Sequence, residues 1–147
     1  MLIEILTNKI VLSAFFSAVI AQIIKSLIHL YKTGHYDWRW LFRDAGFPSA
    51  HTATVVSATL AVYLLEGVTN LTIICAIYAA ITMRNVIGDK IFAEKQEKLI
   101  NQIIIKIQQS LAGEKVEWKH LIGHTIREVV AGFILGIIIT AVVFYYL

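Results

Sequence analysis

Two histidines stand in sequence contexts where an imidazole can do chemistry. One ends the run Pro48-Ser49-Ala50-His51, and the other, His124, precedes Glu128 by four residues. Residues at this spacing share a helix face and can hydrogen-bond. A carboxylate bonded to one imidazole nitrogen fixes the tautomer and leaves the other nitrogen as a nucleophile or base. His124 is therefore a candidate nucleophile, and Glu128 is the candidate residue that orients it.

Two expected helix starts would add an anion-binding environment. The N-terminus of a helix exposes backbone N–H groups and the positive end of the helix dipole, and both suit phosphate oxygens. One helix is expected to begin after Pro48 with Ser49 as its cap, and another near Gly123. Both candidate histidines therefore lie beside helix starts that favour a phosphate group.

The elements that must position these groups are expected to be membrane helices. Of the 147 residues, 58% are hydrophobic and only 16% are charged, whereas a soluble domain is about half apolar and about a quarter charged. A water-soluble core of this size cannot absorb so much apolar surface, so lipid must solvate part of it. The composition indicates one integral membrane domain over residues 1–147.

The charge, the cysteine count and the N-terminal segment narrow the class of protein further. The net charge of +3 gives no indication of a nucleic-acid partner, and none is expected. Cys75 is the only cysteine, which excludes an internal disulfide and a cysteine metal cluster. The segment from Met1 to Asn8 contains Glu4 and no basic residue, so the first apolar segment is predicted to be a mature helix and not a signal peptide.

Four apolar segments are expected to cross the bilayer, which takes roughly 20 apolar residues each. The second reaches this length only if its helix includes Ser49 to His51. Gly67 is the expected C-cap of that second helix, in a tight turn. The four segments run from about Ile10 to Leu30, Thr52 to Leu65, Leu71 to Ile87 and Ile122 to Leu147.

Between the third and fourth segments, residues 89–112 follow an amphipathic pattern. Such a helix lies in the membrane interface or packs on the bundle. The predicted fold is therefore an all-α polytopic bundle of four transmembrane helices plus one amphipathic interfacial helix. The apolar positions that recur at helical spacing are Ile91, Phe92, Leu99, Ile103, Ile107 and Leu111.

The basic residues predict the orientation of the bundle. Of the 13 Lys and Arg residues, only Lys9 falls on the side that holds the two ends of the chain and the short turn at Gly67. Cytoplasmic loops carry the excess of Lys and Arg. Both termini are therefore expected outside the cytoplasm, and the two long connections inside it.

On this topology the unusual polar residues gather at the cytoplasmic ends of all four helices. A charged group at membrane depth costs roughly 2.5–3.5 kcal/mol on insertion scales, so such groups face a cavity or one another. Their gathering predicts a site. The residues, in chain order, are Gln22, Lys25, Ser49, His51, Arg84, Asn85, His124, Arg127 and Glu128.

Several of these features also have ordinary structural explanations. Lys25 can extend along the helix to the lipid headgroups, and membrane histidines commonly hydrogen-bond between helices. Gly132 and Gly136 form a Gly-x-x-x-Gly pair, which serves close helix packing within one chain or across a homodimer.

The order and spacing of these motifs resemble a known family. Pro48-Ser49-Ala50-His51 is similar to the Pro-Ser-Gly-His motif of the type-2 phosphatidic acid phosphatases and vanadium haloperoxidases. The closer resemblance is to a small divergent branch of membrane proteins from bacteria and plants. That branch carries Gln-x-x-Lys, Gly-Gly-Met-Pro-Ser-Ser-His-Ser-Ala, a Lys-Gln pair and Leu-Gly-His-Thr-Pro-x-Glu-Val. Here these read Gln22 to Lys25, Ala45 to Ala53, Lys95-Gln96 and Ile122 to Val129.

The resemblance implies a phosphohydrolase without metal or cofactor in a bacterial inner (plasma) membrane. It implies that His124 attacks phosphorus and that Glu128 orients it, while His51 protonates the leaving oxygen and later activates water. Its implied substrate is a phosphorylated lipid. The implied phosphate-binding residues are Lys25, Ser49, Ala50 and Lys90, and the implied supporting residues are Gln22, Asn85 and Gln96.

Departures from the branch keep a second hypothesis open. After its third helix the branch has Asp followed by Gly-Val-Arg-Arg, where this chain has Asn85 and then Gly88-Asp89-Lys90-Ile91. One carboxylate is thus an amide, and one of two cations is missing. The sequence supports either a lipid phosphate phosphatase or a catalytically degraded relative that binds or carries the lipid. A structural bundle without ligand is the third alternative.

Overall fold

The computed structural model describes residues 4–5, 7–36, 38, 46–110 and 126–147. Four helices make up most of this part of the chain: α2 (Lys9–Thr33), α3 (Ala50–Glu66), α4 (Asn70–Ser110) and α5 (Ile126–Tyr146). No strand occurs in these ranges. The predicted all-α membrane bundle is confirmed.

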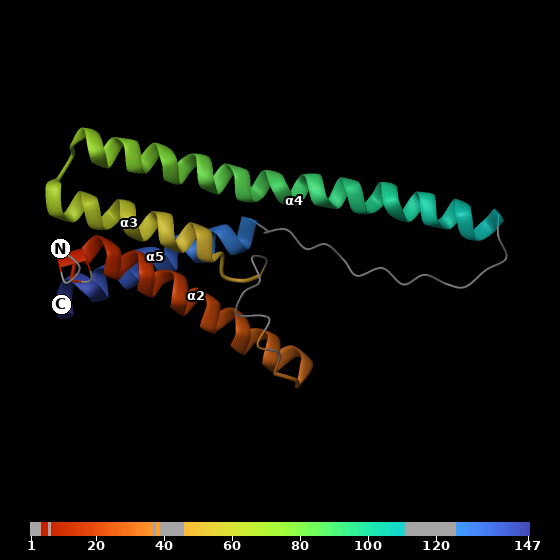
Figure 1. The fold of residues 1–147 in the computed structure, drawn as a ribbon, viewed down its shortest axis with the longest axis horizontal. Coiled ribbons are helices and arrows are strands. Elements are labelled where there is room, and N and C mark those ends of the chain that lie inside the picture. The colour runs from red at the N-terminus through yellow and green to blue at the C-terminus, as the bar shows by residue number, and fades with distance from the viewer. Residues whose placement is uncertain (1–3, 6, 37, 39–45, 111–125) are drawn as a thin grey trace.

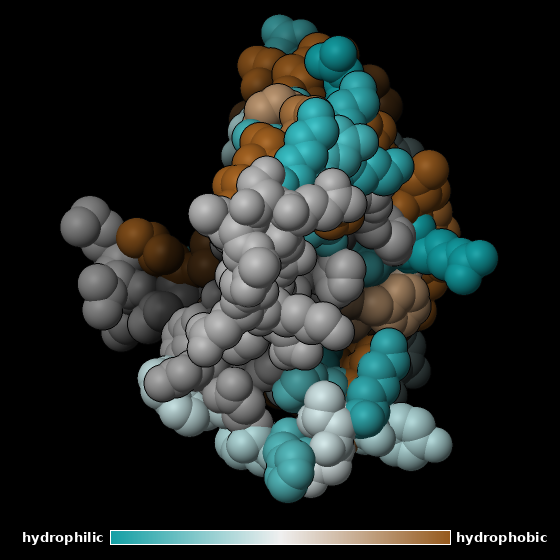
Figure 2. Space-filling model, turned by 90° about the vertical axis from the view of Figure 1, so that its right-hand side faces the viewer, coloured by the Kyte–Doolittle hydropathy of each residue, from teal (hydrophilic) through white to brown (hydrophobic). Residues whose placement is uncertain are grey.

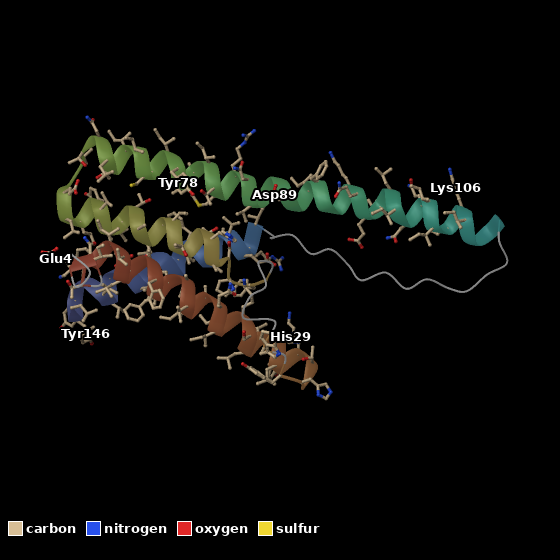
Figure 3. The ribbon with its side chains drawn as sticks, viewed as in Figure 1. Glu4, His29, Tyr78, Asp89, Lys106 and Tyr146 are labelled. Carbon is tan, nitrogen blue, oxygen red and sulfur yellow. The ribbon has the colours of Figure 1, made fainter. Side chains whose placement is uncertain are left out.

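The helices pack around α3, which contacts α2, α4 and α5 (Figure 1). Glu4 and Tyr146 lie at one end of the bundle, and His29 and Asp89 lie toward the other (Figure 3). The Lys9 ammonium sits 5.0 Å from the centre of the Phe144 ring, which ties the two ends of the chain together. Residues near the two ends of the chain therefore lie at the same end of the bundle, and the side of the membrane that they face stays a prediction.

Local sequence explains where α3 begins and ends. The Ser49 hydroxyl accepts a hydrogen bond from the Thr52 N–H at 3.4 Å, as an N-cap does. At the other end Gly67 adopts φ +73°, a backbone conformation that favours glycine, and donates its N–H to the Tyr63 carbonyl at 2.8 Å. Both predicted caps are confirmed.

The contact between α3 and α5 is made by backbone approaching backbone. A Cβ added at Gly136 would lie 2.7 Å from the Ala53 carbonyl oxygen and 3.2 Å from the Ser57 nitrogen, and one at Gly132 would overlap the Ser49 carbonyl oxygen. About one turn further along, the hydroxyls of Ser57 and Thr140 hydrogen-bond at 2.8 Å. The Gly-x-x-x-Gly pair therefore serves packing within the chain.

Within the part of the chain that the structure describes, three helical segments are long and apolar enough to span a bilayer: Lys9–Thr33, Asn70–Asp89 and Ile126–Tyr146. With 17 residues, α3 measures about 25 Å, somewhat less than the hydrocarbon core of roughly 30 Å. Seven of its residues are nevertheless buried among the other helices. A count of four crossing helices remains a prediction.

The third span and the amphipathic segment form one continuous helix, where the sequence analysis expected two elements. The 41 residues of α4 extend about 60 Å, and the half beyond Asp89 projects past the other helices (Figure 1). Gly88 is the only glycine in α4, which contains no proline, and a single glycine inside a helix is tolerated. Hydrophilic and hydrophobic side chains lie side by side on this projecting half, at the top of Figure 2.

The glycine contact yields a matched test of packing. Gly136→Ala places a methyl group against the backbone of α3, and we expect it to lower the free energy of unfolding in detergent by about 1–3 kcal/mol. Gly88→Ala, on a helix surface with nothing within 4 Å of the new Cβ, should raise it by about 0.5–1 kcal/mol. Denaturant titration of both variants checks this, and equal effects would contradict the packing described.

Candidate functional site

The site is built from the start of α3 outward. Residues 46–49 lead into the helix, and the Phe47–Pro48 peptide bond is cis. Pro48, Ser49 and Ala50 are all buried. The Ser49 hydroxyl also accepts a hydrogen bond from the Thr52 hydroxyl at 3.1 Å. This hydroxyl therefore serves to cap the helix, and the first-turn N–H groups are the donors that suit an anion.

Lys25 of α2 lies directly under the loop that precedes α3. A Cβ added at Gly46 would lie 2.9 Å from Cγ of Lys25 and 3.0 Å from its Cδ. The backbone at Gly46 has φ +131°, which side-chain-bearing residues rarely adopt. Glycine thus allows the loop to rest on the lysine stem. Lys25 is only 2% exposed, in a region where its attraction for an anion is much stronger than in water.

Glu128, in the first turn of α5, joins the same cluster. The Glu128 carbonyl accepts a hydrogen bond from the Ser49 N–H at 3.0 Å. Glu128 as a whole is only 9% exposed. A carboxylate in the first turn is favoured by the helix dipole. The Ser49 N–H is therefore committed to α5, and donation to a phosphate falls to the N–H groups that follow it.

The structure thus brings Lys25, Ser49, Ala50 and Glu128 together from three helices. His51 lies next to them in the first turn of α3, where its residue is exposed. Gln22 stands three residues before Lys25, with its Oε1 buried. The sequence analysis expected polar groups from all four helices at this end, and the structure places those of α2, α3 and α5 near one another.

Other predicted residues lie elsewhere or outside the described part. His124, two residues before Ile126, lies outside the described residues. The side chain of Lys90 also lies outside them, so the roles predicted for both residues stay predictions. Arg84 and Asn85 are exposed on α4. Gln96 is exposed on the projecting half of α4, about 10 Å along the axis beyond Asp89. The structure does not bring Gln96 into the cluster.

One row of polar residues on α2 was missed by the sequence analysis. The hydroxyls of Ser13, Ser17 and Ser26, like Oε1 of Gln22, are buried without a hydrogen-bond partner among the described residues. A buried polar group without a partner costs about 1–3 kcal/mol. Ser13 and Ser17, four residues apart on one face of an otherwise apolar helix segment, were the available signal. Gln22, about one turn before Lys25 along α2, extends the polar character of the site into the bundle.

Metal binding is not suggested by the described ranges. They contain no group of three His, Cys, Asp or Glu residues arranged to hold an ion. The chemistry available to the cluster is that of a buried ammonium, a helix start, an imidazole and a carboxylate.

Comparison with known proteins extends this picture beyond single motifs. A family model described as the divergent PAP2 family matches residues 6–139. The chain belongs to the divergent PAP2 family. It is also 32% identical over 155 aligned positions to the uncharacterized membrane protein YuiD of Bacillus subtilis (strain 168), with 97% of this chain and 98% of that protein covered. No solved structure matches the chain. Membership confirms the resemblance, and the membrane-protein relative together with the apolar helices shows an integral membrane protein.

The contact between Gly46 and Lys25 can be tested by a double-mutant cycle. Gly46→Ala should lower the free energy of unfolding by about 1–3 kcal/mol, because the methyl group meets the lysine stem. In a Lys25→Ala background that stem is gone, and the loss should shrink by at least about 0.5 kcal/mol. Unfolding titrations of the four proteins measure this coupling. Equal losses in both backgrounds would mean that Gly46 is required for its backbone conformation alone.

Proposed function

We propose that this chain hydrolyses a lipid phosphate or pyrophosphate, of the phosphatidate or polyprenyl phosphate class, at the cytoplasmic face of a bacterial plasma membrane. The proposal rests on one observation, the cluster of Lys25, the start of α3 and Glu128 at one end of a membrane bundle. Its position suits a headgroup whose hydrocarbon tail stays in the bilayer. Membership of a PAP2-related family supports the reaction class.

The first step forms a covalent bond to the protein. An imidazole nitrogen of His124 attacks phosphorus, the bond from phosphorus to the ester oxygen breaks, and His51 donates a proton to the departing oxygen. Glu128 holds the imidazole of His124 in its reactive orientation. For a lipid phosphate the products of this step are a phosphohistidine and the lipid alcohol. For a lipid pyrophosphate the bridging oxygen departs instead of the ester oxygen, and the products are a phosphohistidine and the lipid monophosphate.

The second step releases phosphate. His51, now neutral, takes a proton from water, and the resulting hydroxide attacks phosphorus as the bond to His124 breaks. In both steps the Lys25 ammonium and the first-turn N–H groups of α3 stabilise the charge on the phosphoryl oxygens. Electrostatic stabilisation by fixed donors is usually the largest single contribution to catalysis.

A second candidate function is binding or transport of the lipid without turnover. The observation that favours it is Asn85, an exposed amide where the branch has a carboxylate. A chain of this kind would retain the anion-binding cluster and lack the reaction. A single measurement of phosphate release and lipid binding separates the two candidate functions.

The deciding experiment measures phosphate release by purified protein in lipid vesicles from a panel of phosphatidates, polyprenyl phosphates and pyrophosphates. His124→Ala should abolish release, and His51→Ala should slow it by about 10²–10⁴-fold, the usual contribution of an acid–base group. His35→Ala, at an exposed residue away from the cluster, should match the wild type. Wild-type protein that binds these lipids and releases no phosphate would support the non-catalytic candidate.

The proposed orientation has its own test. In a Cys75→Ser background, Glu4→Cys and Leu147→Cys should react with a membrane-impermeant maleimide in intact cells. Lys106→Cys, on the projecting half of α4, should react only after the membrane is opened. This expectation follows from the bias of Lys and Arg to the cytoplasmic side. The reverse labelling pattern would place the cluster at the outer face.

A further inference from the structure

A hollow of about 330 Å³ lies between α3, α4 and α5. It arises because α4 and α5 both pack on α3 but touch each other little. This volume is about twice that of a cavity of roughly 150 Å³ that takes up benzene. Its wall is made largely by Val56 and Tyr63 of α3, Ala76 and Met83 of α4, and Phe133 and Ile137 of α5.

The hollow offers almost nothing to a polar ligand. Its polar lining groups are the phenol of Tyr63 at the far end and the hydroxyls of two threonines, which are already used. Thr59 donates to the Val55 carbonyl at 2.7 Å, with the Cys75 carbonyl at 3.2 Å, and Thr72 donates to the Gly67 carbonyl at 2.7 Å. At membrane depth no water is available to occupy such a hollow, so the ligand that suits it is hydrocarbon.

The position of the hollow connects it to the cluster. Val56 follows His51 by five residues and Phe133 follows Glu128 by five, so the near end of the hollow lies about 7–8 Å along each helix from the site. Tyr63 and Thr72 mark its far end, beside the turn at Gly67. The hollow therefore runs along the bundle axis, with the buried cation and the start of α3 beyond its near end.

We propose that this hollow, named here the tail groove, holds the hydrocarbon tail of the phosphorylated lipid while the phosphate lies at the cluster. This inference rests on the proposed function for the identity of the headgroup. A tail in the groove would direct the phosphate toward Lys25 and His51 and would favour lipids with long chains. Binding of the tail and binding of the phosphate would then be separable contributions to affinity.

Photolabelling tests occupancy without requiring turnover. The probes are a phosphatidate and a polyprenyl phosphate, each with a diazirine midway along its tail, beside diacylglycerol and phosphatidylcholine with the same tail. We expect at least one phosphorylated probe to label the segments 76–83 and 133–137 more strongly than the lipids without a phosphomonoester. Equal labelling by all the lipids would overturn the proposal, because the groove would then take up any bilayer chain.

A matched pair of variants locates the effect. Ala76→Trp fills the groove and should abolish this selective labelling, whereas Ala80→Trp, exposed on the same helix outside the groove wall, should leave it unchanged. Losing the burial of two or three methylenes should also raise KM about tenfold or more for long-chain lipid phosphates. KM for a phosphatidate with six-carbon tails should not change.

The failure of each proposal has its own signature. Selective labelling that Ala76→Trp removes, without phosphate release from any lipid, would sustain the groove and reject the enzyme. Phosphate release in which Ala76→Trp changes KM equally for long and short tails would sustain the enzyme and reject the groove. Labelling that persists in Ala76→Trp would also reject the groove.

Discussion

The whole arrangement depends on how closely α5 can approach α3. Gly132 and Gly136 present no side chain to α3, so the backbones of the two helices meet. In a bilayer, where hydrophobic association between helices is weak, such close packing and interhelical hydrogen bonds hold helices together. The hydrogen bond between the Ser57 and Thr140 hydroxyls adds to this contact. At the end nearest the candidate site, the hydrogen bond from the Ser49 N–H to the Glu128 carbonyl joins the two helices. Without that approach the first turn of α5 would not lie against the start of α3.

Much of the fold could be predicted because its causes are local. Apolar length marks the helices, and Ser49 and Gly67 mark the ends of α3 by cap chemistry that acts within a few residues. The continuity of α4 could not be predicted, because an amphipathic pattern is the same whether its helix lies in the interface or continues a span. The partner of Gly132 could not be predicted either, since small residues permit close packing without selecting the helix that uses it.

The site was predictable in position more than in detail. Placing Lys25, Ser49 and Glu128 at one end of the bundle required only topology. That the Ser49 N–H binds a carbonyl of α5, and that Gly46 rests on the stem of Lys25, are tertiary contacts that no spacing in the chain encodes. The buried hydroxyls of Ser13 and Ser17 were overlooked because isolated serines in a membrane helix usually bond to their own backbone.

The length of α4 joins two places that would otherwise be independent. Ala76 and Met83, on the wall of the tail groove, belong to the same unbroken helix as Lys106 beyond the bundle. A continuous helix acts as a lever, so a rotation or tilt applied at its projecting end is transmitted to the segment inside the membrane. The space between α4 and α5 would widen or narrow accordingly, because these two helices hold each other only weakly. A displacement of the projecting end would therefore reach the interior of the bundle.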